Sequence, residues 1–211
     1  VFDPDEDDAV PERNGSIWPH VESAIVDLVL EHRSSIVFAN SRRLSERLTA
    51  KLNEQYAERM QEEPALVAAA SGGAPAPAPE AEGRSADPIL ARAHHGSVSK
   101  EQRAFIEDDL KSGRLKCVVA TSSLELGIDM GSVDLVVQVE APPSVASGLQ
   151  RVGRAGHQVG EVSRGVLFPK YRGDLVQCAL VAERMRSGAI ESIRYLRNPL
   201  DVLAQQVVAI V

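Results

Sequence analysis

Two nearly continuous apolar runs constrain the fold more than any other feature of this chain: KCVVA at 116–120 and DLVVQV at 134–139. A run of this kind is typical of a strand that is buried on both faces of a sheet. Shorter β-rich runs occur at 35–39 (SIVFA), 89–93 (ILARA) and 165–168 (GVLF). Together these segments predict a central sheet that is covered on both sides.

Segments with helical periodicity separate the apolar runs. Helices are expected to begin near Trp18, Ser41 and Ser99, and a long one is expected over roughly 172–187. Another is expected to carry the stretch that starts at Gly148. Strands that alternate with helices imply an α/β fold, a parallel sheet with right-handed crossovers and helices on both faces.

Composition divides the chain into segments. Residues 1–15 are acidic and read as a linker, whereas 64–88 is rich in Ala, Pro and Gly and predicts a flexible surface insertion in the domain 16–190. Within 191–211, NPLDVLAQQVVAIV starts a new helical pattern, and the sequence stops inside it. We therefore expect a fragment of a longer polypeptide.

The charge is unevenly distributed. Of the net charge of −7, residues 1–12 contribute −6 and residues 54–88 contribute −5, which leaves about +4 on the rest. The folded part can therefore accept a polyanionic partner. No apolar run approaches the length of a membrane span and the acidic start does not resemble a signal peptide, so we expect a cytosolic protein. Cys117 and Cys178 are expected to be buried thiols.

Small polar residues follow three of the predicted strands, at 39–42 (ANSR), 94–97 (HHGS) and 120–123 (ATSS). Ligands of parallel sheets gather at the carboxyl ends of strands, where helix N-termini favour phosphate. Three such ends along one edge suit the phosphates of a nucleic-acid strand. The alternative is that Ser41, Ser99 and Thr121 are ordinary helix caps.

The stretch GLQRVGRAGHQVG at 148–160 places Arg151 and Arg154 among four glycines, with no acidic residue inside the run. Arginines in this setting are expected to bind an anion that the chain itself does not supply. The alternative is a glycine-rich surface turn with solvated arginines.

Four segments resemble, in order, motifs IV to VI of superfamily 2 helicases: IVFANSRRLSERL (36–48), AHHGSVSKEQR (93–103), VVATSSLELGIDMGSVDLV (118–136) and QRVGRAGH (150–157). The segment SLELGIDMG, followed by APPSVASGLQRVGRAGHQVG, is similar to the corresponding sequences of the Lhr (large helicase-related) family of bacteria and archaea. The similarity runs from about Ser16 to the end, where 191–211 resembles the entry into that family's winged-helix domain.

The resemblance implies that the chain is the second of two RecA-like lobes that clamp ATP between them. Gln150 and Arg154 would then face the γ-phosphate, with Arg154 as an arginine finger, and Gly127 and Asp129 would line the nucleotide cleft. Many superfamily members carry a second arginine where this chain has His157, which leaves His157 or Arg151 to share the charge.

The same resemblance implies residues for a single-stranded DNA or the tracking strand of a duplex. The residues that would hold its phosphates are Asn40, Ser41, Arg42, His95, Gly96, Ser97 and Thr121. The implied activity is that of an ATP-dependent helicase that translocates 3′ to 5′.

Two absences limit what this chain can do alone. No glycine is followed by lysine, so the chain lacks a phosphate loop. The acidic run 5–8 spells D-E-x-D but lies in a tail rather than after an apolar strand. We therefore expect the isolated chain to be inactive, with Mg²⁺ held mainly by the first lobe. His94, His95 and Cys117 lack the spacing of a zinc site. The alternatives are a non-catalytic RecA-like module that binds nucleic acid or protein, and a generic nucleotide-binding domain.

Overall fold

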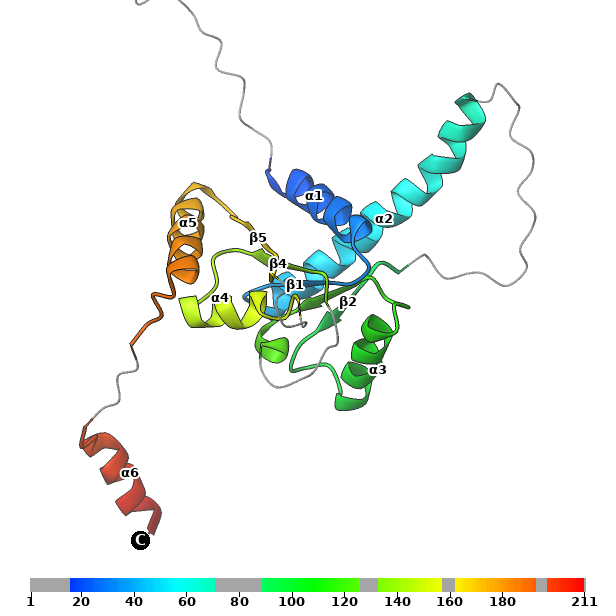
Figure 1. Cartoon of the computed structure of the whole chain (residues 1–211). Coiled ribbons are helices and arrows are strands. Elements are labelled where there is room, and N and C mark those ends of the chain that lie inside the picture. The colour runs from blue at the N-terminus through cyan, green and yellow to red at the C-terminus, as the bar shows by residue number, and fades with distance from the viewer. Residues whose placement is uncertain (1–15, 71–88, 126–132, 157–161, 193–196, 211) are drawn as a thin grey trace, which may run out of the picture.

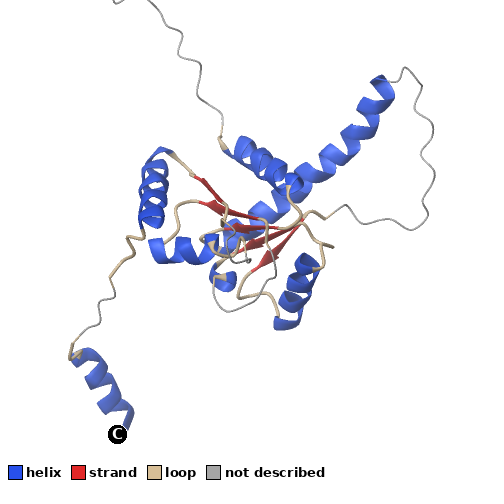
Figure 2. Cartoon of the chain, viewed as in Figure 1, coloured by secondary structure: helices blue, strands red, loops and turns tan. Residues whose placement is uncertain are grey.

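The core of the fold is a five-stranded parallel sheet with strand order β2-β3-β1-β4-β5. The computed structural model describes residues 16–70, 89–125, 133–156, 162–192 and 197–210. The strands are β1 (Ser35–Phe38), β2 (Ala91–His94), β3 (Cys117–Ala120), β4 (Leu135–Val139) and β5 (Gly165–Phe168). Figure 2 shows these strands at the centre of the molecule. All five predicted strands are therefore confirmed.

Helices cover both faces of the sheet, as the sequence predicts. The described helices are α1 (Trp18–Glu31), α2 (Arg42–Ala70), α3 (Lys100–Lys111), α4 (Val145–Val152), α5 (Arg172–Ser187) and α6 (Leu200–Ile210). Helices α1 and α2 pack on one face, whereas α3 and the short 3₁₀ helix η1 (Ser122–Leu124) pack on the other (Figure 1).

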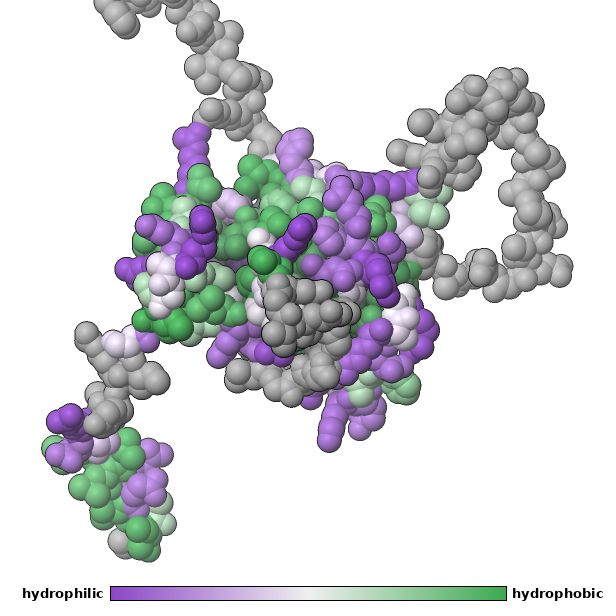
Figure 3. Space-filling model, viewed as in Figure 1, coloured by the Kyte–Doolittle hydropathy of each residue, from purple (hydrophilic) through white to green (hydrophobic). Residues whose placement is uncertain are grey.

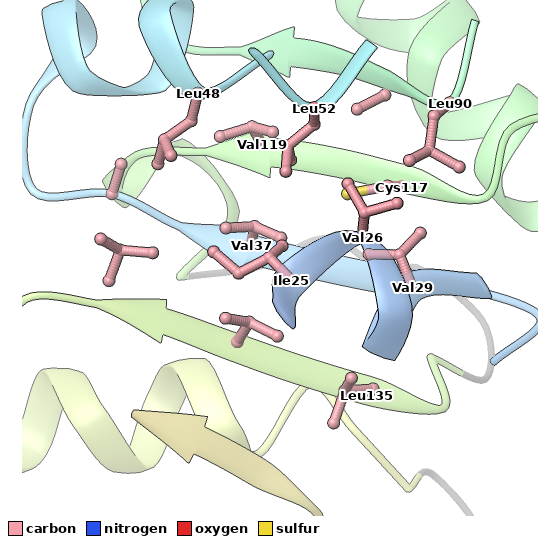
Figure 4. Close-up of a cluster of buried hydrophobic side chains, with 14 of the residues drawn as sticks. Ile25, Val26, Val29, Val37, Leu48, Leu52, Leu90, Cys117, Val119 and Leu135 are labelled. Atoms are coloured by element: carbon pink, nitrogen blue, oxygen red, sulfur yellow. The ribbon is translucent and has the colours of Figure 1, made fainter. Parts of the chain in front are cut away.

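Alternate residues of the strands supply the two halves of the core. Val37 and Val119 point toward α1 and α2, where Ile25 and Leu48 meet them (Figure 4). Their neighbours Ile36, Phe38 and Val118 join the core under α3. Every residue of β1, β3 and β4 is buried. This confirms that the runs 116–120 and 134–139 form strands buried on both faces, and it shows the same for β1. Burial of each large aliphatic side chain contributes about 1.5–3 kcal/mol.

Helix α2 extends further than the sequence pattern predicts. The expected insertion began at residue 64, but the helix continues through Pro64 to Ala70. The alanines at 65 and 68–70 have the highest helix propensity of any residue, which favours this extension. Residues 71–88, the rest of the expected insertion, lie outside the described residues.

Helix α5 begins and ends as expected, and α6 lies within the helical pattern predicted in 191–211. Helix α5 stops at Gly188, whose φ of 69° is the left-handed conformation that glycine adopts readily at a helix end. None of the residues of α6 is buried, and Figure 3 shows much of its surface as hydrophobic. That 191–211 starts a winged-helix domain stays a prediction.

Both thiols are buried, as predicted. Burial raises the pKa of Cys117 to about 12 and that of Cys178 to about 11. Within the described ranges, no helix combines the length and the apolar character that crossing a membrane requires.

Candidate functional site

The carboxyl ends of the strands come together at one edge of the sheet. Phe38 and His94 both lie level with Ala120, so the residues that follow β1, β2 and β3 are neighbours. A hollow of about 380 Å³ opens there. It is lined by Asn40, Ser41, Arg42, His95, Gly96, Ser97, Thr121, Ser122, Glu125, Pro143, Ser147 and Arg151. The fold thus brings together all seven residues that the resemblance implied for a nucleic-acid strand.

Two of the three candidate helix caps do act as caps. The Ser41 hydroxyl accepts a hydrogen bond from the Leu44 amide at 3.2 Å, and the Ser99 hydroxyl accepts one from the Gln102 amide at 3.2 Å. Thr121 makes no capping bond with its side chain. The capping interpretation is therefore right for Ser41 and Ser99, and Ser41 lines the hollow as well.

The loop after β2 is held in place across the hollow. The Arg42 guanidinium donates from Nη1 to the Ser97 hydroxyl at 2.8 Å. His95 is 3% exposed: its Nδ1 accepts from the Ser97 amide at 3.3 Å, and its Nε2 lies 2.7 Å from a Glu46 carboxylate oxygen. Both ring nitrogens of His95 already have protein partners, so this ring shapes the loop.

His94 joins β2 to the turn that carries Thr121. Its Nδ1 lies 2.8 Å from the Ser123 hydroxyl, and its Nε2 lies 3.0 Å from a Glu107 carboxylate oxygen of α3. Burial lowers the pKa of His94, and the hydrogen bond to Glu107 acts in the opposite direction. The adjacent His95 has a different carboxylate partner, Glu46.

The surroundings of Arg151 show that the expectation was wrong for this residue, because the chain itself supplies its anion. Its side chain is 2% exposed and forms an ion pair with Glu125, to which both Nε (2.7 Å) and Nη2 donate. Its Nη1 donates to Asn40 Oδ1 at 2.9 Å and to Gln138 Oε1 at 2.8 Å. The Ser147 hydroxyl donates to the same Glu125 oxygen at 3.0 Å. One guanidinium therefore connects the ends of three strands at the hollow.

Gln150 and Arg154 lie apart from this network. Gln150 is exposed on α4, and Arg154 follows the end of that helix, half-buried, with its Nε donating to the Gln150 carbonyl at 3.3 Å. The next residue, Ala155, forms an isolated parallel β-bridge with Val133, and Gly156 adopts a φ of 74°. Neither Gln150 nor Arg154 lines the hollow. The other residues expected at the nucleotide, namely Gly127, Asp129 and His157, lie outside the described residues.

Sequence reasoning missed the polar partners of Arg151. Gln138 left a signal, because it is the one amide inside a strand run that is otherwise apolar, and a buried polar group needs a partner. Glu125 and Ser147 left none, since only the fold brings them to Arg151.

Gln150 and Arg154 have side chains that suit phosphate oxygens, whereas a guanidinium has no lone pair to offer a metal ion. Gln150 and Arg154 offer an amide and a guanidinium, groups that bind phosphate oxygens. In the parts of the chain that the structure describes, no group of three or more His, Cys, Asp or Glu side chains could hold a metal.

Comparisons with known proteins show which helicases the chain resembles. A family model described as "Helicase conserved C-terminal domain" matches residues 81–158. The chain is 69% identical over 202 residues to the Lhr helicase of Mycolicibacterium smegmatis and 61% identical over 198 residues to the Lhr helicase/uracil glycosylase of Escherichia coli. Each match covers 93% of this chain, which spans only 13% of either relative.

A solved structure extends the comparison to the fold. The structure of Mycobacterium smegmatis helicase Lhr bound to ssDNA and AMP-PNP matches 94% of this chain and 23% of that one, at 67% identity and a TM-score of 0.75. The chain therefore belongs to the Lhr family of superfamily 2 helicases and has the fold of their C-terminal RecA-like lobe.

Proposed function

We propose that this chain is the second motor lobe of an ATP-dependent helicase or translocase that moves 3′ to 5′ along a nucleic-acid strand. The observation that carries the proposal is the hollow, where three strand ends contribute hydroxyl, amide, backbone and guanidinium groups. Such groups bind phosphate oxygens without reading base sequence. The described residues that line the hollow include no Phe, Tyr or Trp, and the ring of His95 is only 3% exposed, so we assign the binding to phosphate contacts rather than to base stacking.

Single-stranded DNA is the partner that we assign to the hollow. The similar Lhr structure is bound to ssDNA, which supports this choice. We also propose a cytoplasmic location for the protein.

ATP would be shared with a first RecA-like lobe of the same polypeptide. Arg154 and Gln150 would face the γ-phosphate, where a guanidinium can stabilise the developing charge through two parallel hydrogen bonds. Gly127, Asp129 and His157 would complete the nucleotide cleft. Hydrolysis of ATP would supply the free energy of translocation. Mg²⁺ would be held mainly by the first lobe. The isolated chain should therefore show no ATP hydrolysis.

A non-catalytic binding module is the second candidate, since a hollow for phosphates does not by itself require a motor. The two candidates differ at Arg154, which a passive module has no need to place beside a nucleotide. Loss of ATP hydrolysis in a longer helicase that carries Arg154→Gln would favour the motor. Unchanged hydrolysis would favour the module.

Strand binding can be tested on the chain itself with a fluorescein-labelled oligothymidylate. Arg42→Gln and Thr121→Val should each weaken binding several-fold, and equally for other base compositions, because the lost contacts are to phosphates. Arg186→Gln, an exposed change on α5, is the matched control and should bind as the parent does. Parent-like affinity in both hollow variants would refute the assignment of the hollow.

A further inference from the structure

Glu125 occupies the position that an anionic ligand of Arg151 would take. One of its carboxylate oxygens accepts hydrogen bonds from Arg151 Nε at 2.7 Å, from Arg151 Nη2 and from the Ser147 hydroxyl at 3.0 Å. The side chain of Arg151 is only 2% exposed and that of Glu125 is 13% exposed, and both residues line the hollow. A carboxylate and a phosphate bind a guanidinium through the same pair of N–H groups. The carboxylate therefore stands where a phosphate of the strand could bind.

The pair leaves the hollow with little positive charge. Its arginines are Arg42 and Arg151, and its acidic residue is Glu125. Because Glu125 neutralises Arg151, Arg42 supplies the net positive charge among the described lining residues. Cations that neutralise phosphates dominate the affinity of proteins for nucleic acid. The hollow should therefore bind nucleic acid much more weakly than it would if both arginines were unpaired.

We propose that Glu125 is an internal competitor for the strand: it holds Arg151 and keeps the lobe's affinity for nucleic acid low. The inference rests on the proposed function, because a translocating lobe must release each phosphate after binding it. An arginine that was fully available to the strand would slow that release. Glu125 thus tunes affinity and is a positioning residue for Arg151 rather than a contact of the strand.

Three variants separate competition from simple structural support. Glu125→Gln keeps the size of the side chain and an accepting oxygen but removes the charge, so Arg151 becomes available and affinity should rise about tenfold. Arg151→Gln leaves the Glu125 charge in the hollow, so affinity should fall by a similar factor. The double variant restores neutrality, and its affinity should lie within about twofold of the parent, as expected when two charges cancel.

A purely structural pair predicts a different order. Removing either partner of a buried ion pair leaves an unpaired charge and destabilises the fold. If the pair served only the fold, both single variants would bind the strand more weakly, in proportion to their loss of stability. Tighter binding by a less stable variant is a result that structural support alone does not produce.

The experiment measures fluorescence anisotropy of a labelled oligothymidylate with the chain, over a range of KCl concentrations and below each variant's melting temperature. We expect affinity to fall in the order Glu125→Gln, parent and double variant together, then Arg151→Gln. The salt slope of Glu125→Gln should steepen by about 0.7, the increment for one more phosphate on a single strand. Affinity of Glu125→Gln at or below that of the parent would overturn the inference.

Two further comparisons keep the outcome decisive. If Glu125→Gln does not fold, a double variant with parent-like affinity above Arg151→Gln supports the inference, and a double variant as weak as Arg151→Gln overturns it. Thr121→Val removes a hydroxyl from the hollow without touching the pair. Weaker binding by Thr121→Val with no gain in Glu125→Gln overturns this inference alone, whereas unchanged binding in both overturns the proposed function too.

Discussion

Arg151 and Arg154 are three residues apart in one motif, yet they belong to different surroundings. Arg151 is buried in α4 and bonded to residues from three strand ends, whereas Arg154 follows the helix and folds back on the Gln150 carbonyl. The helix stops at Val152, so the chain has already turned when it reaches Arg154. The partners of each arginine therefore depend on the strand ends that it faces and not only on the motif that contains it.

The largest effect should come from Arg154→Gln in a longer helicase that also contains the first lobe. Steady-state ATP hydrolysis with saturating ssDNA should fall by about 10³ or more, the scale for loss of an arginine finger. Affinity for ssDNA should change by less than about twofold, because the strand's phosphates would be held elsewhere. Arg154→Lys should restore little, since an ammonium cannot reproduce the planar fork. Retained hydrolysis with weakened ssDNA binding would show that Arg154 contacts the strand and not the nucleotide.

The two arginines should also differ in stability, as measured by urea unfolding of the chain. Arg151→Ala leaves the Glu125 carboxylate mostly buried without its cation, and should lower the free energy of unfolding by about 3 kcal/mol. Arg154→Ala, at a half-buried position after the helix, should lower it by less than about 1 kcal/mol. Equal losses would show that burial of Arg151 contributes no more than a surface interaction.

A pair of glycine variants sharpens the contrast between the hollow and the turn. A Cβ at Gly96 would meet no heavy atom within 4 Å, so Gly96→Ala should keep the parent's melting temperature. Its methyl group would enter the hollow where a strand backbone approaches, so ssDNA affinity should fall several-fold, a scale of roughly 1 kcal/mol. Unchanged affinity would mean that no strand comes close to Gly96.

Gly156→Ala is the counterpart in the turn after Arg154. The φ of 74° is costly for alanine, and the fold should lose about 1 kcal/mol of stability. Affinity for ssDNA should stay at the parent's value. A thermal melt and an anisotropy titration check both expectations.

The smallest expected effect is on salt dependence. Arg42→Gln removes the cation that Glu125 does not neutralise, so the slope of log affinity against log salt should become shallower by about 0.7. Thr121→Val removes an uncharged contact and should leave that slope unchanged while lowering affinity. Equal slopes in all three proteins would place the phosphates away from Arg42.

Much of this fold could be read from local patterns. The apolar runs identified all five strands, and helical periodicity indicated the helix at 172–187. The gathering of Asn40, His95 and Thr121 followed from one rule, that parallel strands end at the same edge of a sheet. These predictions succeeded because each depends on sequence period or on topology alone.

The site was less predictable where it depends on packing. Glu125 and Arg151 are 26 residues apart in sequence, and nothing in either segment shows that η1 and α4 bring them into contact. The length of α2 was missed for another reason: Pro64 suggested an end, but the alanine-rich segment after it continues the helix. Side-chain partners and exact helix ends depend on the whole fold, which local patterns do not contain.

If the hollow binds the strand while Arg154 faces another ligand, the two regions should respond differently to a nucleic acid. Backbone amide NMR of the chain, titrated with a short oligothymidylate, measures both responses at once. We expect the largest shift changes at the amides of Gly96, Ser97, Thr121 and Ser122, with small changes at Gln150 and Arg154. Large changes at Gln150 and Arg154, with the amides of the hollow unmoved, would contradict this expectation.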